Sequence, residues 1–343
     1  MDTTGTFYYI DLSSIEPHAR PWSKVDVGAT SYRLTARERP VTDLRGLPSP
    51  SSFTTDNAGF ALVRSPTSVP ASCFLLRDSS SPPPSSSSSP DPIRDTYYAE
   101  VSSLLRAHLP AGDRVREIVI FDHTVRRRDP SAPRAPVTQV HVDQTAAAAA
   151  ARVRRHVGGA AQAEAYLRPG RRFQLINVWR AVGAAAADMP LAVVDWRSTA
   201  PRDFVPVDLL YPKQQRRRRP DSAVGGVGAA SAEDDDDDDD DRGKERRPDE
   251  STWGSAEGYE VRGETMAVAP SERHRFYYAK DLAPDEVLLL KCYDSWGEGE
   301  PHGGREGIAV RTPHTAFVDP ATPADAPPRQ SIEVRCLVFY DDE

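Results

Sequence analysis

Short runs of β-branched and aromatic residues, separated by Gly, Pro, Asp and Ser turns, recur along most of this chain and constrain its fold more than any other feature. Runs of this length and composition are typical of β-strands. We expect strands at Glu117–Asp122, Val137–Asp143, Phe173–Trp179, Leu191–Asp195, Phe276–Tyr278, Val287–Tyr293 and Ile332–Tyr340. Many short strands joined by turns favour a β-sandwich or a barrel.

Helical patterns are fewer. In Thr96–Leu109 the apolar residues recur about every 3.6 positions, and Thr145–His156 is rich in alanine and precedes Gly158 and Gly159. We therefore expect a mainly β (α+β) fold with flanking helices. The chain has no Gly-x-Gly-x-x-Gly sequence after a predicted strand, which argues against a dinucleotide-binding fold.

Two segments of biased composition interrupt the predicted strands. Residues 77–92 are rich in Ser and Pro, whereas residues 213–250 carry the basic cluster Arg216–Arg219, a Gly/Ala stretch and the acidic run Glu233–Asp241. Such sequences bury too little apolar surface to offset the entropy that is lost on ordering. We expect a low-complexity loop and a disordered charged insertion within a single domain of residues 1–343.

Charge and cysteine content restrict the class of protein. The formal net charge of −8 is due to the acidic run, so nothing in the rest of the chain indicates a nucleic-acid or membrane partner. Three widely spaced cysteines argue against a disulfide framework and a structural zinc site. We find neither a signal-peptide pattern at the N-terminus nor a stretch of about 18 apolar residues. A cytoplasmic location is expected, with nuclear import through Arg216–Arg219 as the alternative.

The sequence His141-Val142-Asp143 places two metal-binding side chains within one predicted strand. Residues two apart in a strand point to the same face, so the imidazole and the carboxylate can bind one metal ion. A second imidazole from elsewhere would complete the two-histidine, one-carboxylate triad of non-haem Fe(II) oxygenases. Because His-x-Asp recurs by chance in many proteins, this pair alone is weak support for a metal site.

The C-terminal segment strengthens the metal hypothesis. His314 lies between a turn and a strand, and Arg329 and Ser331 follow it by about fifteen residues at the start of the last predicted strand. In 2-oxoglutarate oxygenases the far carboxylate of the cosubstrate needs a fixed cation, and arginine binds it with two parallel hydrogen bonds. Ser331, two residues further on the same strand face, can donate another hydrogen bond to this carboxylate. Arg335 on the same strand face competes with Arg329 for this role. The alternative is that these arginines pair with Glu333 in an internal network.

Asn177 lies in a third predicted strand beside Trp179 and Arg180. One interpretation is an active-site wall in which Asn177 hydrogen-bonds cosubstrate or substrate. The other interpretation is a core Trp with an Arg at the strand edge, and the sequence favours neither. Beyond the metal centre it indicates no separate catalytic residue.

Beyond these spacings, the chain resembles the fungal hydroxylase/desaturase family that includes the gibberellin desaturase and the 7α-cephem-methoxylase-like proteins. The matching segments are Val41–Gly46, Ile118–Arg127, Val140–Thr145, Ile176–Arg180, Pro190–Asp195, Asp285–Ser295, Thr312–Phe317 and Pro327–Tyr340. Together they are far more specific than His-x-Asp. The charged insertion between Tyr211 and Trp253 departs from the family pattern, so the resemblance leaves the substrate open.

The resemblance implies a double-stranded β-helix (jelly-roll, cupin-like) oxygenase core. It implies dependence on Fe(II) and 2-oxoglutarate, with ascorbate as the reductant in vitro, and the hydroxylation or desaturation of a small secondary metabolite with dioxygen. His141, Asp143 and His314 match the iron ligands, and Arg329 matches the cosubstrate anchor. Three alternatives stay open: a metal enzyme of this fold that needs no 2-oxoglutarate, a noncatalytic binding module, and a regulatory protein that acts through the charged insertion.

Overall fold

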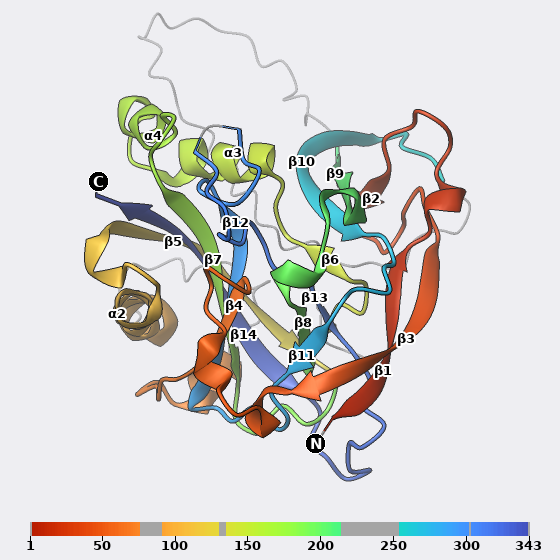
Figure 1. Ribbon diagram of the computed structural model, residues 1–343, viewed down its shortest axis with the longest axis vertical. Coiled ribbons are helices and arrows are strands. Elements are labelled where there is room, and N and C mark those ends of the chain that lie inside the picture. The colour runs from red at the N-terminus through yellow and green to blue at the C-terminus, as the bar shows by residue number, and fades with distance from the viewer. Residues whose placement is uncertain (1, 76–90, 130–134, 214–253, 302, 342–343) are drawn as a thin grey trace, which may run out of the picture.

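Two β-sheets and four α-helices make up the computed structural model of the protein, which describes residues 2–75, 91–129, 135–213, 254–301 and 303–341 (Figure 1). The nine-stranded sheet contains, in spatial order, β1 (Thr3–Ile10), β3 (Leu34–Asp43), β11 (Phe276–Tyr278), β8 (Leu191–Val194), β13 (His314–Ala316), β6 (His141–Val142), β10 (Tyr259–Val268), β9 (Phe204–Pro212) and β2 (Trp22–Lys24). The five-stranded sheet contains β4 (Phe60–Arg64), β12 (Glu286–Asp294), β7 (Phe173–Ala181), β14 (Gln330–Tyr340) and β5 (Val115–Arg127). The helices are α1 (Ala71–Leu75), α2 (Tyr98–His108), α3 (Ala146–His156) and α4 (Ala160–Tyr166).

Strand β14 shows how the five-stranded sheet divides its residues between two faces. Ile332, Val334 and Cys336 belong to the apolar cluster that contains the buried residues of α2, which covers the outer face of this sheet (Figure 1). Because side chains alternate along a strand, the intervening residues Glu333 and Arg335 point to the inner face, toward the nine-stranded sheet. The inner face of β14 is therefore polar and charged, whereas its outer face is apolar.

The strands on either side of β14 continue this polar inner face. Glu333 is opposite Thr124 in β5 and Trp179 in β7, and Arg335 pairs in the same way with Asp122 and Asn177. Ser331 is opposite Arg126 and Ala181. Opposite residues in antiparallel strands share a face, so these side chains form one wall of the space between the sheets.

The facing wall comes from the middle of the nine-stranded sheet. Strand β13 pairs with β8 on one side and with β6 on the other, and His314 lies directly opposite His141. The apolar cluster that includes Trp179 and Leu288 of the five-stranded sheet also includes Val193 of β8, so the two sheets pack on each other.

The strand and helix predictions are largely confirmed, with one correction. All seven predicted strands and both predicted helices occur in the structure; Phe276–Tyr278 has the predicted bounds, and the other elements have shifted ends. The strand expected at Val137–Asp143 is shorter, because only His141–Val142 is in regular pairing and Gln139 makes an isolated bridge to Tyr8. Pro136 immediately precedes this stretch and lacks the N–H group that a continuing ladder needs.

Parts of two sequence predictions lie outside the described residues: positions 77–90 of the Ser/Pro-rich loop and positions 214–250 of the charged insertion, including Arg216–Arg219. In the part of the chain that is described, no helix is both long and apolar enough to cross a membrane.

Candidate metal centre

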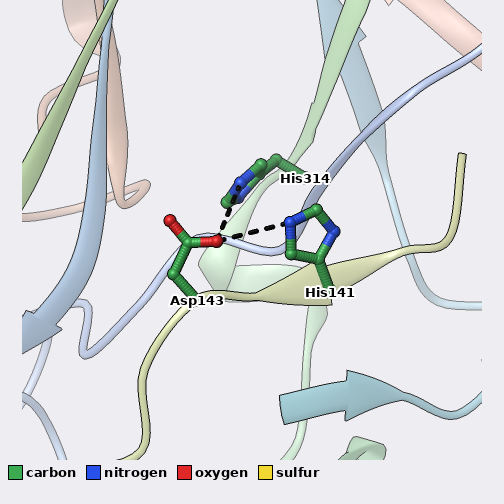
Figure 2. Close-up of side chains that lie close together, drawn as sticks. All are labelled: His141, Asp143 and His314. Atoms are coloured by element: carbon green, nitrogen blue, oxygen red, sulfur yellow. Dashed lines mark ion pairs between the residues drawn. The ribbon is translucent and has the colours of Figure 1, made fainter. Parts of the chain in front are cut away.

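His141, Asp143 and His314 meet between the two sheets. Their ligand atoms all lie within 4.8 Å of one another. Figure 2 shows both rings directed at one oxygen: Oδ1 of Asp143 is 3.4 Å from Nε2 of His141 and 3.8 Å from Nε2 of His314. Two imidazole nitrogens and one carboxylate oxygen are the donor set of the facial triad that binds Fe(II) and keeps positions open for other ligands. The residues present therefore fit the metal.

The other ring nitrogen of each histidine is held by the backbone. Nδ1 of His141 lies 2.8 Å from the carbonyl oxygen of Gln139, and Nδ1 of His314 lies 3.0 Å from that of Thr312. A carbonyl oxygen only accepts hydrogen bonds, so Nδ1 carries the proton in each neutral ring. The lone pair is then on Nε2, which faces Asp143. Metal-binding histidines are typically oriented in this way.

Asp143 carries a negative charge in this centre. Burial alone would raise the pKa of its carboxyl, but the neighbouring His141, His314 and Arg335 hold the pKa well below its ordinary value. Burial and the neighbouring His141 lower the pKa of His314. Burial also acts to lower the pKa of His141, but Asp143 outweighs it and the pKa is raised. A carboxylate beside a neutral imidazole is an environment that favours a cation.

The triad opens onto a cavity that both sheets line. Its other lining residues are Arg126, Val137, Trp179, Leu191, Thr315, Ala316, Arg329 and Glu333. The cavity is small, about 30 Å³, and its lining combines a few apolar and aromatic side chains with charged groups. A space of this size holds about one water molecule or a metal ion.

Arg329 is buried at this cavity, just before β14, with 3% of its surface exposed. One of its terminal nitrogens donates to the carbonyl oxygen of Met189, and its guanidinium lies 5.4 Å from the ring of Trp179. Its Nε has no hydrogen-bond partner among the described residues. Burial and the nearby Arg126 lower the pKa of Arg329 to about 9, so the group stays charged at neutral pH. A buried cation with an unused donor suits a carboxylate ligand.

Arg335 lies among carboxylates instead. One terminal nitrogen is 2.7 Å from Oδ2 of Asp122 and the other is 3.2 Å from Oε1 of Glu333, while Nε is 3.8 Å from Oδ2 of Asp143. The interpretation of an internal network with Glu333 therefore holds for Arg335. Ser331, the fourth residue predicted to bind cosubstrate, is buried on the inner face of β14 opposite Arg126.

Asn177 contacts the triad directly. Its Nδ2 donates to Oδ2 of Asp143 over 2.5 Å, so the structure brings this predicted cosubstrate residue to a side chain of the candidate metal centre. Arg126 also lines the cavity, although it was not among the predicted site residues. The predicted strand ended at Asp122, whereas β5 continues to Arg127, and continued period-two alternation from Asp122 through Thr124 places Arg126 on the inner face.

The comparison with protein families decides the wider relationship. Residues 7–224 and 248–339 match the family model described as "Oxidoreductase/YMDC permease-like domain". The chain belongs to this family. The two matched segments cover most of the chain, including nearly all of both sheets and all three residues of the candidate metal centre.

Curated relatives of this oxidoreductase come from fungi. The chain is 27% identical over 333 residues to hydroxylase/desaturase efuI of Hormonema carpetanum, which covers 92% of this chain and 88% of the relative. It is 29% identical over 250 residues to the Fe(II)/2-oxoglutarate-dependent dioxygenase nvfI of Aspergillus novofumigatus, covering 72% of this chain and 67% of that protein. The predicted membership in the fungal hydroxylase/desaturase group is thus confirmed.

Among solved structures, the iron and alpha-ketoglutarate-dependent endoperoxidase NvfI shares the fold, with a TM-score of 0.67 at 24% identity over 99% of this chain and 98% of that chain. The predicted mainly β, jelly-roll fold is confirmed. The predicted enzyme class, an oxidoreductase, and the predicted cofactors, Fe(II) and 2-oxoglutarate, agree with the names of these relatives. The roles of the individual site residues stay predictions.

Proposed function

We propose that this chain is an Fe(II)- and 2-oxoglutarate-dependent oxygenase that hydroxylates or desaturates a small secondary metabolite. The observation that carries the proposal is the convergence of the two Nε2 atoms and Oδ1 of Asp143 on a cavity that also holds the buried Arg329. When bound, the iron supplies the activation of dioxygen that oxidation of an unactivated carbon requires.

In this proposal His141, Asp143 and His314 hold the metal. The backbone carbonyls of Gln139 and Thr312 fix both imidazole rings, so their lone pairs face the metal position before it binds. Because these ligand atoms face the cavity, cosubstrate, dioxygen and substrate would reach a bound metal from that side.

Arg329 binds the far carboxylate of 2-oxoglutarate. Its position in the cavity lining and its Nε, which has no hydrogen-bond partner in the described part of the chain, support this assignment over Arg335, whose guanidinium already contacts three carboxylates. A bound carboxylate would supply the counter-charge that burial of the Arg329 guanidinium requires. Ser331 lies two residues further along, as the sequence pattern requires for an additional donor.

Trp179, Leu191 and Val137 form the apolar part of the cavity. They limit the access of water to the metal position and provide a surface for the carbon skeleton of the substrate. The partners of this chain are then a small organic molecule and dioxygen, with neither nucleic acid nor membrane required. The location in the cell, cytoplasmic or nuclear through Arg216–Arg219, stays a prediction.

The experiment measures metal binding and 2-oxoglutarate turnover on the same purified chain. With Fe(II), ascorbate and 2-oxoglutarate we expect stoichiometric iron binding and succinate release that a chelator abolishes. The double variant His141→Ala, Asp143→Ala should lose both. Iron binding that survives this double substitution would contradict the triad, and a wild-type chain that binds no iron would favour a noncatalytic module.

Two further variants separate the remaining alternatives. Arg329→Met should turn over 2-oxoglutarate far more slowly at cosubstrate concentrations near the wild-type KM while it keeps iron, whereas an enzyme that needs no 2-oxoglutarate would be unaffected by this change. Deletion of residues 214–250 should spare succinate release. If the deletion abolishes the biological effect of the chain and leaves its oxygenase chemistry intact, the charged insertion has a regulatory function of its own.

A further inference from the structure

The two carboxylate oxygens of Asp143 have different surroundings. Oδ1 is the oxygen that both histidines face, at 3.4 and 3.8 Å. Oδ2 points to the five-stranded sheet, where Nδ2 of Asn177 lies 2.5 Å away. The carboxylate therefore bridges the two sheets, with one oxygen directed to the candidate metal position and the other bound by protein.

Asn177 is fully buried in the middle of β7, and its amide has one orientation that the chemistry permits. An ionised carboxylate only accepts hydrogen bonds, so the NH2 group of Asn177 faces Asp143. Its carbonyl oxygen Oδ1 has no hydrogen-bond partner among the described residues. A buried amide with an unpaired carbonyl is unfavourable in itself, so the contact with Asp143 is what accounts for a polar residue at this position.

Two further groups lie on the same side of Asp143 as Asn177. Nε of Arg335 is 3.8 Å from Oδ2, and Asp122 and Glu333 hold its guanidinium in place. The thiol of the buried Cys292 is also 3.8 Å from Oδ2. Asn177 makes the short contact, while the other two groups surround the same oxygen.

We propose that Asn177, supported by Arg335, is a positioning residue that holds Asp143 by Oδ2, so that Oδ1 alone is presented to the metal. This inference rests on the proposed metal site. It explains why the carboxylate of Asp143 has the orientation that the site needs. Without the Asn177 amide, the carboxylate group of Asp143 can rotate and is no longer fixed before the metal binds. Loss of such a partner typically lowers metal affinity by about 10–100-fold.

This role differs from the one that the sequence predicts for Asn177, a direct contact with cosubstrate or substrate. A positioning residue changes the affinity for metal in the absence of 2-oxoglutarate. A cosubstrate contact changes the KM for 2-oxoglutarate and leaves metal affinity as it is. The two roles therefore give different results in separate titrations.

The test titrates metal-free protein with Co(II), without 2-oxoglutarate, and follows binding by calorimetry and by visible absorption. Asn177→Leu keeps the branching and the number of heavy atoms of the side chain and removes the donor. The matched control is Gln174→Met, because Gln174 is a buried amide of the same strand whose Nε2 donates to Oδ2 of Asp294 over 2.7 Å. We expect Asn177→Leu to raise the Kd for Co(II) by about 10–100-fold and to alter the absorption bands. Gln174→Met should lower the melting temperature and leave the Kd and the bands unchanged.

Each outcome has a defined meaning. A wild-type Kd for Asn177→Leu, or an equal loss of affinity in Gln174→Met, would overturn the positioning role. If wild type itself binds no Co(II), the proposed metal site fails and not only the role of Asn177. Should Asn177→Leu not fold, Asn177→Ser replaces it, because its short hydroxyl falls short of Asp143 and adds no apolar group. The serine variant should show the same loss of affinity, and wild-type binding by it would also overturn the proposal.

Discussion

The protein contains two clusters of buried charge, one around Asp294 and the other around Asp143. Strand β7 contacts both, through Gln174 at Asp294 and through Asn177 at Asp143. In the first cluster Oδ2 of Asp294 lies 2.6 Å from Nζ of Lys291 and 2.7 Å from a terminal nitrogen of Arg172. A second carboxylate, Asp56, contacts the same two cations, and Gln174 donates a further hydrogen bond to Asp294. Two cations and two carboxylates thus form a closed set.

The second cluster is open on one side. The Nε2 atoms of both histidines and Oδ1 of Asp143 face a cavity, and Arg329 at the same cavity has an unpaired Nε among the described residues. The pKa values also distinguish the closed cluster from the open one. Lys291 and Arg172 outweigh the effect of burial and lower the pKa of Asp294 to about 2, whereas burial lowers the pKa of Arg329 to about 9.

The two clusters show how a structural buried charge can be distinguished from one that binds a ligand. A closed set gains its stabilisation within the protein itself, and removal of one member leaves the others without a partner. An open set keeps groups that a ligand would complete, so their removal affects the ligand more than the fold. Four predictions test this distinction.

The largest expected effect comes from Asp143→Asn. The change is nearly isosteric and removes the only carboxylate among the three triad side chains, so stoichiometric Fe(II) or Co(II) binding and succinate release should be lost. The melting temperature of the metal-free chain should fall less than in Asp294→Asn, because Oδ1 of Asp143 faces the cavity, whereas the counter-ions of Asp294 lie within the protein. Calorimetric titration and thermal unfolding of the same sample measure both quantities.

The control for this prediction is Asp294→Asn in the closed cluster. It leaves Lys291 and Arg172 short of a counter-ion in the core, so the free energy of unfolding should fall by about 3–5 kcal/mol. Metal affinity should stay at the wild-type value. If Asp294→Asn instead abolished metal binding without loss of stability, the division into a structural and a functional cluster would be wrong.

Arg329→Met is the second prediction. Loss of the guanidinium should raise the KM for 2-oxoglutarate by about 10–100-fold, as expected for a hydrogen-bonded charged contact worth about 1.5–3 kcal/mol. The free energy of unfolding should not decrease, because a buried cation is removed whose carboxylate partner is the ligand. The comparison variant Arg172→Met should show the opposite: lower stability and an unchanged KM. A destabilised Arg329→Met chain with a normal KM would place Arg329 in the structural class.

The third prediction concerns pH. The pKa of Asp294 is about 2 in the folded chain, below its ordinary value of 3.8. Its stabilising contribution is therefore complete above about pH 4 and is lost as the pH falls from there toward 2. This difference corresponds to about 2 kcal/mol, of which about half is lost by pH 3. Urea unfolding at pH 4.5 and pH 3.0 should show a steeper loss for wild type than for Asp294→Asn, and equal slopes would contradict the assigned pKa.

Much of the open cluster could be predicted from sequence. The spacing of His141, Asp143, His314 and Arg329 identifies residues that the fold does bring together, because period-two alternation and strand pairing are regular. The choice between Arg329 and Arg335 could not be made in this way. Both arginines fit one face of the last strand. Only the pairing of β14 with β5 shows that Arg335 lies opposite Asp122 and forms an ion pair with it.

The closed cluster was harder to foresee. Lys291 and Asp294 are three residues apart, and in a regular strand such residues point to opposite faces. A register shift between Lys291 and Tyr293 brings their side chains together, and a sequence pattern does not record such a bulge. The contact between Asn177 and Asp143 was inaccessible for another reason, since it joins two different sheets.

The smallest expected effect tests whether the two clusters are independent. Thr312 connects them: its N–H donates to the carbonyl oxygen of Lys291 over 2.7 Å, and its own carbonyl oxygen accepts from Nδ1 of His314. Its buried hydroxyl donates to the carbonyl oxygen of Gly59. Thr312→Val removes that hydroxyl and keeps the backbone, so the free energy of unfolding should fall by only about 1 kcal/mol.

Metal affinity should be unchanged in Thr312→Val, because the carbonyl group that orients His314 belongs to the main chain. Urea unfolding and Co(II) titration measure the two quantities. A loss of affinity as large as that expected for Asn177→Leu would mean that the Thr312 hydroxyl sets the position of this carbonyl. In that case the packing around Gly59 and Lys291 would control the histidine, and the closed cluster would be part of the metal centre rather than a separate support for the fold.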